Sequence, residues 1–201
     1  MNSLPPEWVL ATHNRGKADE FRRLLAGYPA TLELSYVGGA EVVEETGSSY
    51  LENARLKALY AARISGRPAL ADDSGLEVDA LDGRPGLYSA HYVSGDAWEN
   101  LRAVLLEALE TPFAARTCRM RAVVVLARPD GVLIHAEGIV QGHLAGYPRG
   151  TRGFGYDPAF VLPDGRTMAE LWPEEKDAWS HRGRAVRTLL QELKMAPPGF
   201  A

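Results

Sequence analysis

The chain has 201 residues, of which 46% are hydrophobic and 24% are charged, a balance typical of a folded globular protein and not of a disordered or membrane-embedded one. Its net charge of -4 argues against a nucleic-acid partner, which usually needs a basic surface, whereas a small anion needs only a local basic cluster. We therefore expect a single domain over residues 1–201, with a tail over 196–201 that is frayed.

The single cysteine, Cys118, lies in an apolar and β-branched stretch, so we expect a core residue and no disulfide within the chain. No stretch approaches the roughly 18 continuous apolar residues that a membrane-spanning helix needs. The first seven residues lack the basic and apolar regions of a signal peptide. These features predict a cytoplasmic protein with no membrane partner.

The first part of the chain predicts strands that alternate with helices. Apolar residues over 8–12 indicate a short buried strand, and a helix follows from Gly16. A second strand is expected over 31–37. Ser49 and Glu52 have the spacing of a capping box and predict a helix that runs to about residue 64.

The second part predicts a helix over 95–110, whose apolar residues recur at helical spacing, and a hairpin of strands 119–126 and 132–140 around Pro-Asp-Gly. Strands over 159–162 and 167–169 and a helix over 181–194 follow. Helices interleaved with strands, together with one long hairpin, predict an α/β fold with a mixed sheet.

Two adjacent carboxylates, Asp72 and Asp73, follow an apolar run that begins at Pro68. Asp-Asp-Ser-Gly is ordinary turn chemistry, and we expect a tight turn here between strands over 69–72 and 76–81. The pair is also a possible seat for Mg²⁺, which prefers carboxylate oxygens and activates bound water.

Donors suited to phosphate oxygens gather where the first strand meets its helix. This segment combines a Thr hydroxyl, an Asn amide, a Lys ammonium and the N–H groups of a helix start, although its glycine spacing is not that of a Walker loop. The alternative is a plain N-cap beside a solvated lysine. The candidate phosphate-binding residues are Thr12, His13, Asn14, Arg15, Gly16 and Lys17.

Acidic residues precede the helix that is expected from residue 50. Glu44 and Glu45 either favour the helix dipole or supply a carboxylate that helps Asp73 to hold Mg²⁺. Asn53 and Lys57 share one face of that helix, and Lys57 is either a solvated lysine or a counter-charge for phosphate.

Aromatic and basic residues near the C-terminal end favour a flat ligand that carries a carbonyl group. Glycines flank Phe154, which lets a backbone approach closely, and Phe154 and Tyr156 offer faces for stacking a base. Arg182 has donors only and His181 can donate, so both suit a purine carbonyl rather than the amino group of adenine. A glycine–aromatic turn and an N-cap by Ser180 are the alternative.

Taken in order, these clusters resemble the inosine triphosphate pyrophosphatase family, also called the Ham1 or noncanonical purine nucleoside triphosphate pyrophosphatases. The resemblance covers nearly the whole chain, through ATHNRGK, EETG, ENARLKA, ADDSGLEVDAL, GRPGLYSAHY, GFGYDPAF and AELWPEEKDAWSHRGRA. It implies an α/β fold with two lobes, a long curved mixed sheet with flanking helices, and a nucleotide cleft between the lobes.

The resemblance also implies a Mg²⁺-dependent homodimer that hydrolyses ITP, dITP and XTP to the monophosphate and pyrophosphate. It makes Asp73 the proton acceptor and a metal ligand, with Glu44 as the second metal carboxylate and Glu45 as the alternative. Where relatives commonly carry Arg this chain has His91, and Asp177 follows Lys176 where Asn is frequent. The implied substrate-binding positions are residues 12–17, Asn53, Lys57, Ser74, Phe154, Gly155, Tyr156, Asp157, Lys176, His181 and Arg182.

From these residues we expect Asp73 to deprotonate a water that attacks the α-phosphorus, while Lys17 and Lys57 offset the charge on the phosphates. Two alternatives stay open. One is a Maf-like pyrophosphatase acting on modified pyrimidine triphosphates, and the other is a nucleotide-binding module without catalysis. A panel of nucleoside triphosphates distinguishes them.

Overall fold

The computed structural model describes residues 7–26, 31–33 and 43–195. The rest of the expected strand over 31–37 and the tail from residue 196 lie outside the described residues. Within the part that is described, no helix combines the length and the apolar character that crossing a membrane requires.

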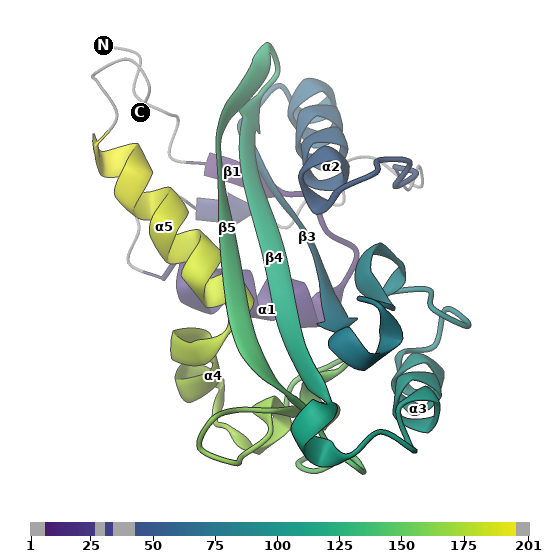
Figure 1. Ribbon diagram of the computed structural model, residues 1–201. Helices are drawn as coiled ribbons and strands as arrows, with labels where there is room; N and C mark the ends of the chain where they lie inside the picture. The colour runs from purple at the N-terminus through teal and green to yellow at the C-terminus, as the bar shows by residue number, and fades with distance from the viewer. Residues whose placement is uncertain (1–6, 27–30, 34–42, 196–201) are drawn as a thin grey trace. The chain divides into compact units, whose positions relative to one another are not determined.

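The strands form one six-stranded sheet with the order β2-β1-β3-β4-β5-β6, and Figure 1 labels β1, β3, β4 and β5 of it. Strand β1 pairs in parallel with β2 and β3, while β5 and β6 are antiparallel, so the sheet is mixed and the predicted α/β fold class is confirmed. The expected hairpin is present, with two residues between β4 and β5, and both strands are longer than predicted. The strands are β1 Glu7–Leu10, β2 Thr31–Glu33, β3 Ala69–Val78, β4 Thr117–Arg128, β5 Gly131–Leu144 and β6 Phe160–Val161.

The expected turn at the acidic pair is wrong, because β3 runs straight through it. Asp72 and Asp73 are only 2% and 5% exposed, and both carboxylates meet basic side chains inside the protein. A carboxylate that is paired with a basic side chain can be buried. Asp72 and Asp73 therefore lie in an extended strand, although the turn preferences of Asp-Asp-Ser-Gly had favoured a bend. The two strands expected over 69–72 and 76–81 are one strand, which ends at Val78. A 3₁₀ helix, Asp79–Leu81, follows it.

All four predicted helices are present, with shifted ends. Helix α3 begins after its N-cap Asp96, and α4 was not foreseen from the sequence. Residues Gly86–Tyr88 form a 3₁₀ helix, and the expected strand over 167–169 is reduced to one bridge at Thr167. The helices are α1 Arg15–Leu24, α2 Tyr50–Ser65, α3 Ala97–Glu107, α4 Pro173–Trp179 and α5 His181–Met195.

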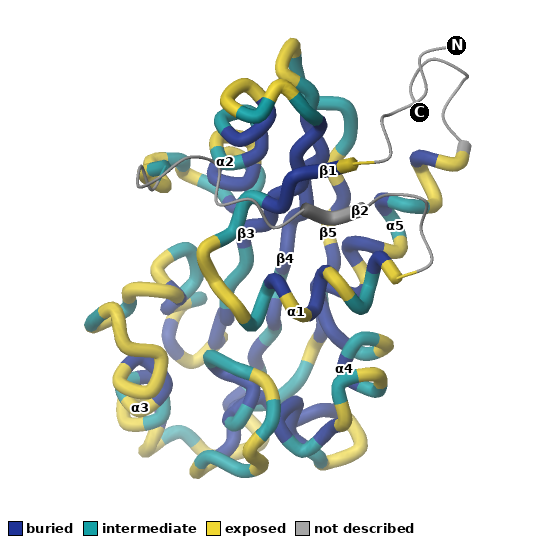
Figure 2. Tube along the Cα trace, turned by 180° about the vertical axis from the view of Figure 1, so that it is seen from behind, coloured by how far each residue is buried: buried dark blue, intermediate teal, exposed yellow. Residues whose placement is uncertain are grey.

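The chain divides into two compact units, each with its own hydrophobic core. The first unit comprises Met1–Asp73, Ala122–Gly138 and Arg182–Ala201. In its core, Phe21 of α1 and Leu189 of α5 pack with Trp8 and Leu70 of the strands. Because one side of α1 packs on this core, buried and exposed positions alternate along the helix (Figure 2).

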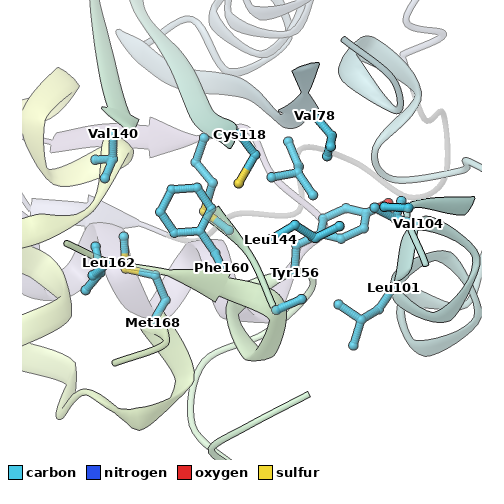
Figure 3. Close-up of a cluster of buried hydrophobic side chains, with 14 of the residues drawn as sticks. Val78, Leu101, Val104, Cys118, Val140, Leu144, Tyr156, Phe160, Leu162 and Met168 are labelled. Atoms are coloured by element: carbon cyan, nitrogen blue, oxygen red, sulfur yellow. The ribbon is translucent and has the colours of Figure 1, made fainter. Parts of the chain in front are cut away.

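The second unit comprises Ser74–Arg121 and Ile139–His181. Its core brings Leu101 and Val104 of α3 together with Cys118, Tyr156 and Phe160, as Figure 3 shows. The prediction that Cys118 is a core residue is confirmed, since its side chain is buried. Burial raises the pKa of this thiol, which keeps it protonated and unreactive.

Candidate active site

Asp73 lies in the first unit, at the point where β3 passes α2. The Asn53 side chain donates to Oδ2 at 3.2 Å, and the Lys57 ammonium lies 3.3 Å from Oδ1. Burial raises the pKa of Asp73, and Glu45 adds to this rise although Lys57 opposes it. A carboxylate with a raised pKa is a stronger base, which suits proton abstraction.

Helix α2 delivers both partners of Asp73 from one face, as the spacing of Asn53 and Lys57 predicted. Ser49 caps the helix by accepting from the Glu52 N–H at 3.2 Å. The expected capping box is only half formed, because the Glu52 carboxylate accepts from the N–H of Ser48 at 2.6 Å and not from that of Ser49. The cap fixes the start of α2, and Asn53 and Lys57 in its next turns contact Asp73 of β3.

The loop before α2 is tied to the same cluster. The Asn53 side-chain oxygen accepts from the Gly47 N–H at 2.8 Å, and the Glu45 carboxylate lies 2.6 Å from the Lys57 ammonium. Glu44 is exposed, and its backbone carbonyl accepts from the Thr46 N–H. Of the two neighbouring glutamates, Glu45 is therefore the one whose side chain shares a cation with Asp73.

Asp72 has different partners from its neighbour. Its Oδ1 lies 3.2 Å from the Lys17 ammonium, and its Oδ2 accepts from Arg182 at 2.9 and 3.0 Å. Arg182 also donates to Glu20 of α1. Although burial alone would raise the pKa of Asp72, Arg182 and Lys17 outweigh that effect and hold the pKa well below its usual range. Asp72 therefore stays ionised as a structural counterion.

The predicted phosphate turn forms the start of α1. Asn14 caps the helix by accepting from the Lys17 N–H at 3.0 Å, and Thr12 accepts from the Asn14 N–H at 3.2 Å. His13, Asn14 and Arg15 are exposed, whereas Gly16 and Lys17 are half-buried. The predicted N-cap is confirmed, and a helix start with an exposed first turn is suited to an anion.

The predicted base-binding loop lies in the second unit and is fixed by a buried ion pair. Asp157 accepts from the Phe154 N–H at 2.7 Å and pairs with Lys176, whose ammonium lies 4.7 Å from the centre of the Phe154 ring. Gly153 has φ 74°, and a Cβ there would come within 2.1 Å of the Asp157 carboxylate. The loop therefore needs glycine at this position.

Two of the predicted ligand residues have structural surroundings instead. The Tyr156 ring packs in the second core (Figure 3), and its hydroxyl donates to the Ser89 carbonyl at 2.9 Å. Arg182 is 1% exposed, and its guanidinium is engaged with Asp72 and Glu20 where a purine carbonyl was expected. Burial explains both outcomes, since interior donors need acceptors in the protein.

The remaining predicted positions differ in exposure. Ser74 and Gly155 are half-buried, His181 is 7% exposed at the start of α5, and His91 is exposed. Sequence reasoning missed Glu20, because no local spacing marks a glutamate whose arginine partner is 162 positions away.

A model of the Ham1 family matches residues 8–192. The chain belongs to the Ham1 family. It is 48% identical to the dITP/XTP pyrophosphatase of Symbiobacterium thermophilum, over 92% of this chain and 93% of that protein. It is 49% identical to a dITP/XTP pyrophosphatase of Thermus thermophilus, over 94% and 93% of the two chains.

Solved Ham1 structures have the same fold. The HAM1 protein of Coxiella burnetii, at 37% identity, superposes with a TM-score of 0.83 over 96% of this chain and 100% of that one. The Ham1 protein of Staphylococcus aureus gives a TM-score of 0.80 at 36% identity, over 94% and 98% of the two chains. The family resemblance inferred from the ordered motifs is confirmed.

Proposed function

We propose that this Ham1-family protein is a hydrolase of nucleoside triphosphates that converts dITP, ITP and XTP to the monophosphate and pyrophosphate in the presence of Mg²⁺. The observation that carries the proposal is Asp73, a buried carboxylate of raised pKa held by Asn53 and Lys57. Relatives named dITP/XTP pyrophosphatases, at nearly half identity over more than nine tenths of the chain, support the substrate class.

The residues around Asp73 fit a hard divalent cation. Asp73 and the neighbouring Glu44 and Glu45 offer carboxylate oxygens, and oxygen is the ligand that Mg²⁺ requires. Glu44 stays the proposed second metal ligand, and Glu45, which shares the Lys57 ammonium with Asp73, is the alternative. Asp72 is less suited to this role, because Lys17 and Arg182 already neutralise it. When bound, the ion supplies positive charge for phosphate oxygens and lowers the pKa of water.

In the proposed reaction, Asp73 accepts a proton from a water as the water oxygen bonds to the α-phosphorus. The bond from that phosphorus to the bridging oxygen breaks, and pyrophosphate leaves. Asn53 and Lys57 fix the orientation of the Asp73 carboxylate through its two oxygens. Lys17 and the N–H groups at the start of α1 offset negative charge on the phosphates, since such transfer depends mainly on positioning and electrostatics.

Pyrophosphate release from ITP, dITP, XTP, GTP, ATP and TTP, measured with and without Mg²⁺, tests the proposal. We expect release from ITP, dITP and XTP that depends on the metal. Preference for TTP or other pyrimidine triphosphates would favour the Maf-like alternative. Nucleotide binding without any pyrophosphate release would favour a non-catalytic module.

We further propose that the enzyme acts as a cytoplasmic homodimer, with a nucleotide cleft between two lobes of one domain. These expectations derive from the family resemblance. Light scattering during gel filtration tests the dimer, and a dimer mass at micromolar concentration is expected. A crystal structure with dITP tests the cleft.

A further inference from the structure

We propose that Arg152 and Trp172 are positioning residues for the purine. Their stacked side chains attach the predicted base-binding loop, residues 153–157, to the start of α4, and so fix the orientation of Phe154 for stacking on a base. The inference rests on the proposed function, because it takes this loop as the part of the site that receives the purine. Neither Arg152 nor Trp172 is among the predicted substrate-binding positions.

The contact between the two side chains is a cation–π interaction. The guanidinium carbon of Arg152 lies 3.7 Å from the centre of the Trp172 ring, well within the roughly 6 Å at which such pairs attract. The same guanidinium donates to the Glu170 carbonyl at 3.3 Å. Trp172 is 61% exposed, so the pair forms at the surface, where it joins two segments of the chain.

The backbone before the loop already lies against the segment that leads into α4. Gly150 has φ 80°, and a Cβ there would overlap the Ala169 carbonyl. The Arg152 N–H donates to that carbonyl at 3.1 Å, and the Thr167 hydroxyl donates to the Arg149 carbonyl at 2.9 Å. The Arg152 side chain extends this contact as far as the first residues of α4.

Phe154 lies between two attachments to the same segment. Arg152 precedes it in the chain and pairs with Trp172, while Asp157 follows it and pairs with Lys176. Glycines with positive φ flank Phe154 on both sides and leave the backbone free to turn there. The direction of the ring therefore depends on both attachments.

Loss of one attachment should act on substrate binding more than on the chemical step. A nucleotide binds only to molecules whose loop is closed, so a smaller closed fraction lowers the apparent affinity. The cluster around Asp73, which is proposed to perform the chemistry, is built from other residues. We therefore expect a higher KM with little change in kcat.

The test combines amide hydrogen exchange without nucleotide and steady-state kinetics with dITP. In Trp172→Leu, exchange of residues 150–157 should be about two- to fivefold faster, which is the value of one exposed cation–π contact, and KM should rise by up to the same factor. Trp172→Tyr keeps an aromatic face and should stay near the wild type. Trp98→Leu is the control, because it removes a tryptophan of α3 that is similarly exposed, at 53%.

A double-variant cycle identifies the contact itself. Arg152→Gln should resemble Trp172→Leu, and the double variant should be no worse than Arg152→Gln alone, because one shared contact is lost only once. Circular dichroism establishes that each variant is folded.

Unchanged exchange and KM in both single variants would overturn the inference, and so would additive effects or a fall in kcat at constant KM. The wild type separates the two proposals. If it hydrolyses dITP while the variants match it in exchange and KM, only the positioning role is rejected. If it hydrolyses none of the purine triphosphates, the proposed function fails instead.

Discussion

At the scale of single residues, Asp72 and Asp73 are adjacent in the sequence but have opposite electrostatic surroundings. Successive side chains of a strand point to opposite faces, so the two carboxylates meet different partners. Arg182 and Lys17 lower the pKa of Asp72, whereas burial raises that of Asp73. The first residue therefore serves stability, and the second has the properties of a base.

Replacing Asp73 by Asn should lower kcat for dITP on the order of a hundredfold or more, because one positioned acid–base group typically contributes that much. Binding of the nucleotide should persist, since the amide keeps the size of the carboxylate. Pyrophosphate release measures kcat, and a fluorescent nucleotide competition assay measures binding. Turnover near that of the wild type would contradict the role of Asp73.

Replacing Arg182 by Met should lower the free energy of unfolding by about 3–5 kcal/mol, because Asp72 and Glu20 would be left as buried charges without their shared partner. Urea unfolding at pH 7 measures the loss. Arg22→Ala is the control, since its pair with Asp19 is more than half exposed and should contribute less than about 1 kcal/mol. Equal effects of the two changes would refute this account of Arg182.

At the scale of elements, α2 determines where the partners of Asp73 lie. The helix presents Asn53 and Lys57 one turn apart, and its cap at Ser49 fixes where that turn begins. The left-handed Gly66 ends the helix just before β3 starts at Ala69. The short connection keeps α2 beside the strand that carries both aspartates.

Ser49→Ala should reduce stability by about 1 kcal/mol, because the Glu52 N–H loses its acceptor at the helix start. Ser49→Gly should cost only a few tenths of a kcal/mol, because glycine leaves the helix-start N–H groups open to water. Chemical denaturation of the two variants beside the wild type gives both values. An alanine variant as stable as the wild type would show that the cap does not stabilise α2.

At the scale of the whole molecule, each unit combines its own hydrophobic core with its own buried ion pairs. Asp72 and Glu20 with Arg182 lie in the first unit, and Asp157 with Lys176 lies in the second. Buried pairs of this kind make the stability of the fold depend on pH, because protonation of a carboxylate removes the pairing.

The Asp72 pKa gives the sign of this dependence. A folded-state pKa below the unfolded one stabilises the protein above the unfolded value of about 3.9, and the contribution is lost as the pH falls towards the folded pKa. Asp72→Asn removes the titrating group. Its free energy of unfolding should therefore fall less steeply than that of the wild type between about pH 5 and pH 3, by up to about 1.4 kcal/mol per pH unit. Parallel curves in urea unfolding would reject this contribution.

Local patterns in the sequence were sufficient for the fold class, the hairpin, the helix caps at Asn14 and Ser49, and the shared face of Asn53 and Lys57. Each depends on spacing within a few residues, where backbone geometry leaves little freedom. The family followed from the order of the motifs along the chain.

Only the tertiary structure decided that the acidic pair lies inside a strand, that Arg182 binds Asp72 and Glu20, and that Tyr156 belongs to the core. The turn preference of Asp-Asp-Ser-Gly applies where the two carboxylates are exposed to water. Asp72 instead has partners from α1 and α5, 55 and 110 positions away counted from Lys17 and Arg182. Pairing with these distant residues offsets the cost of burying the Asp72 charge. The local sequence contains no signal from which these partners could be predicted.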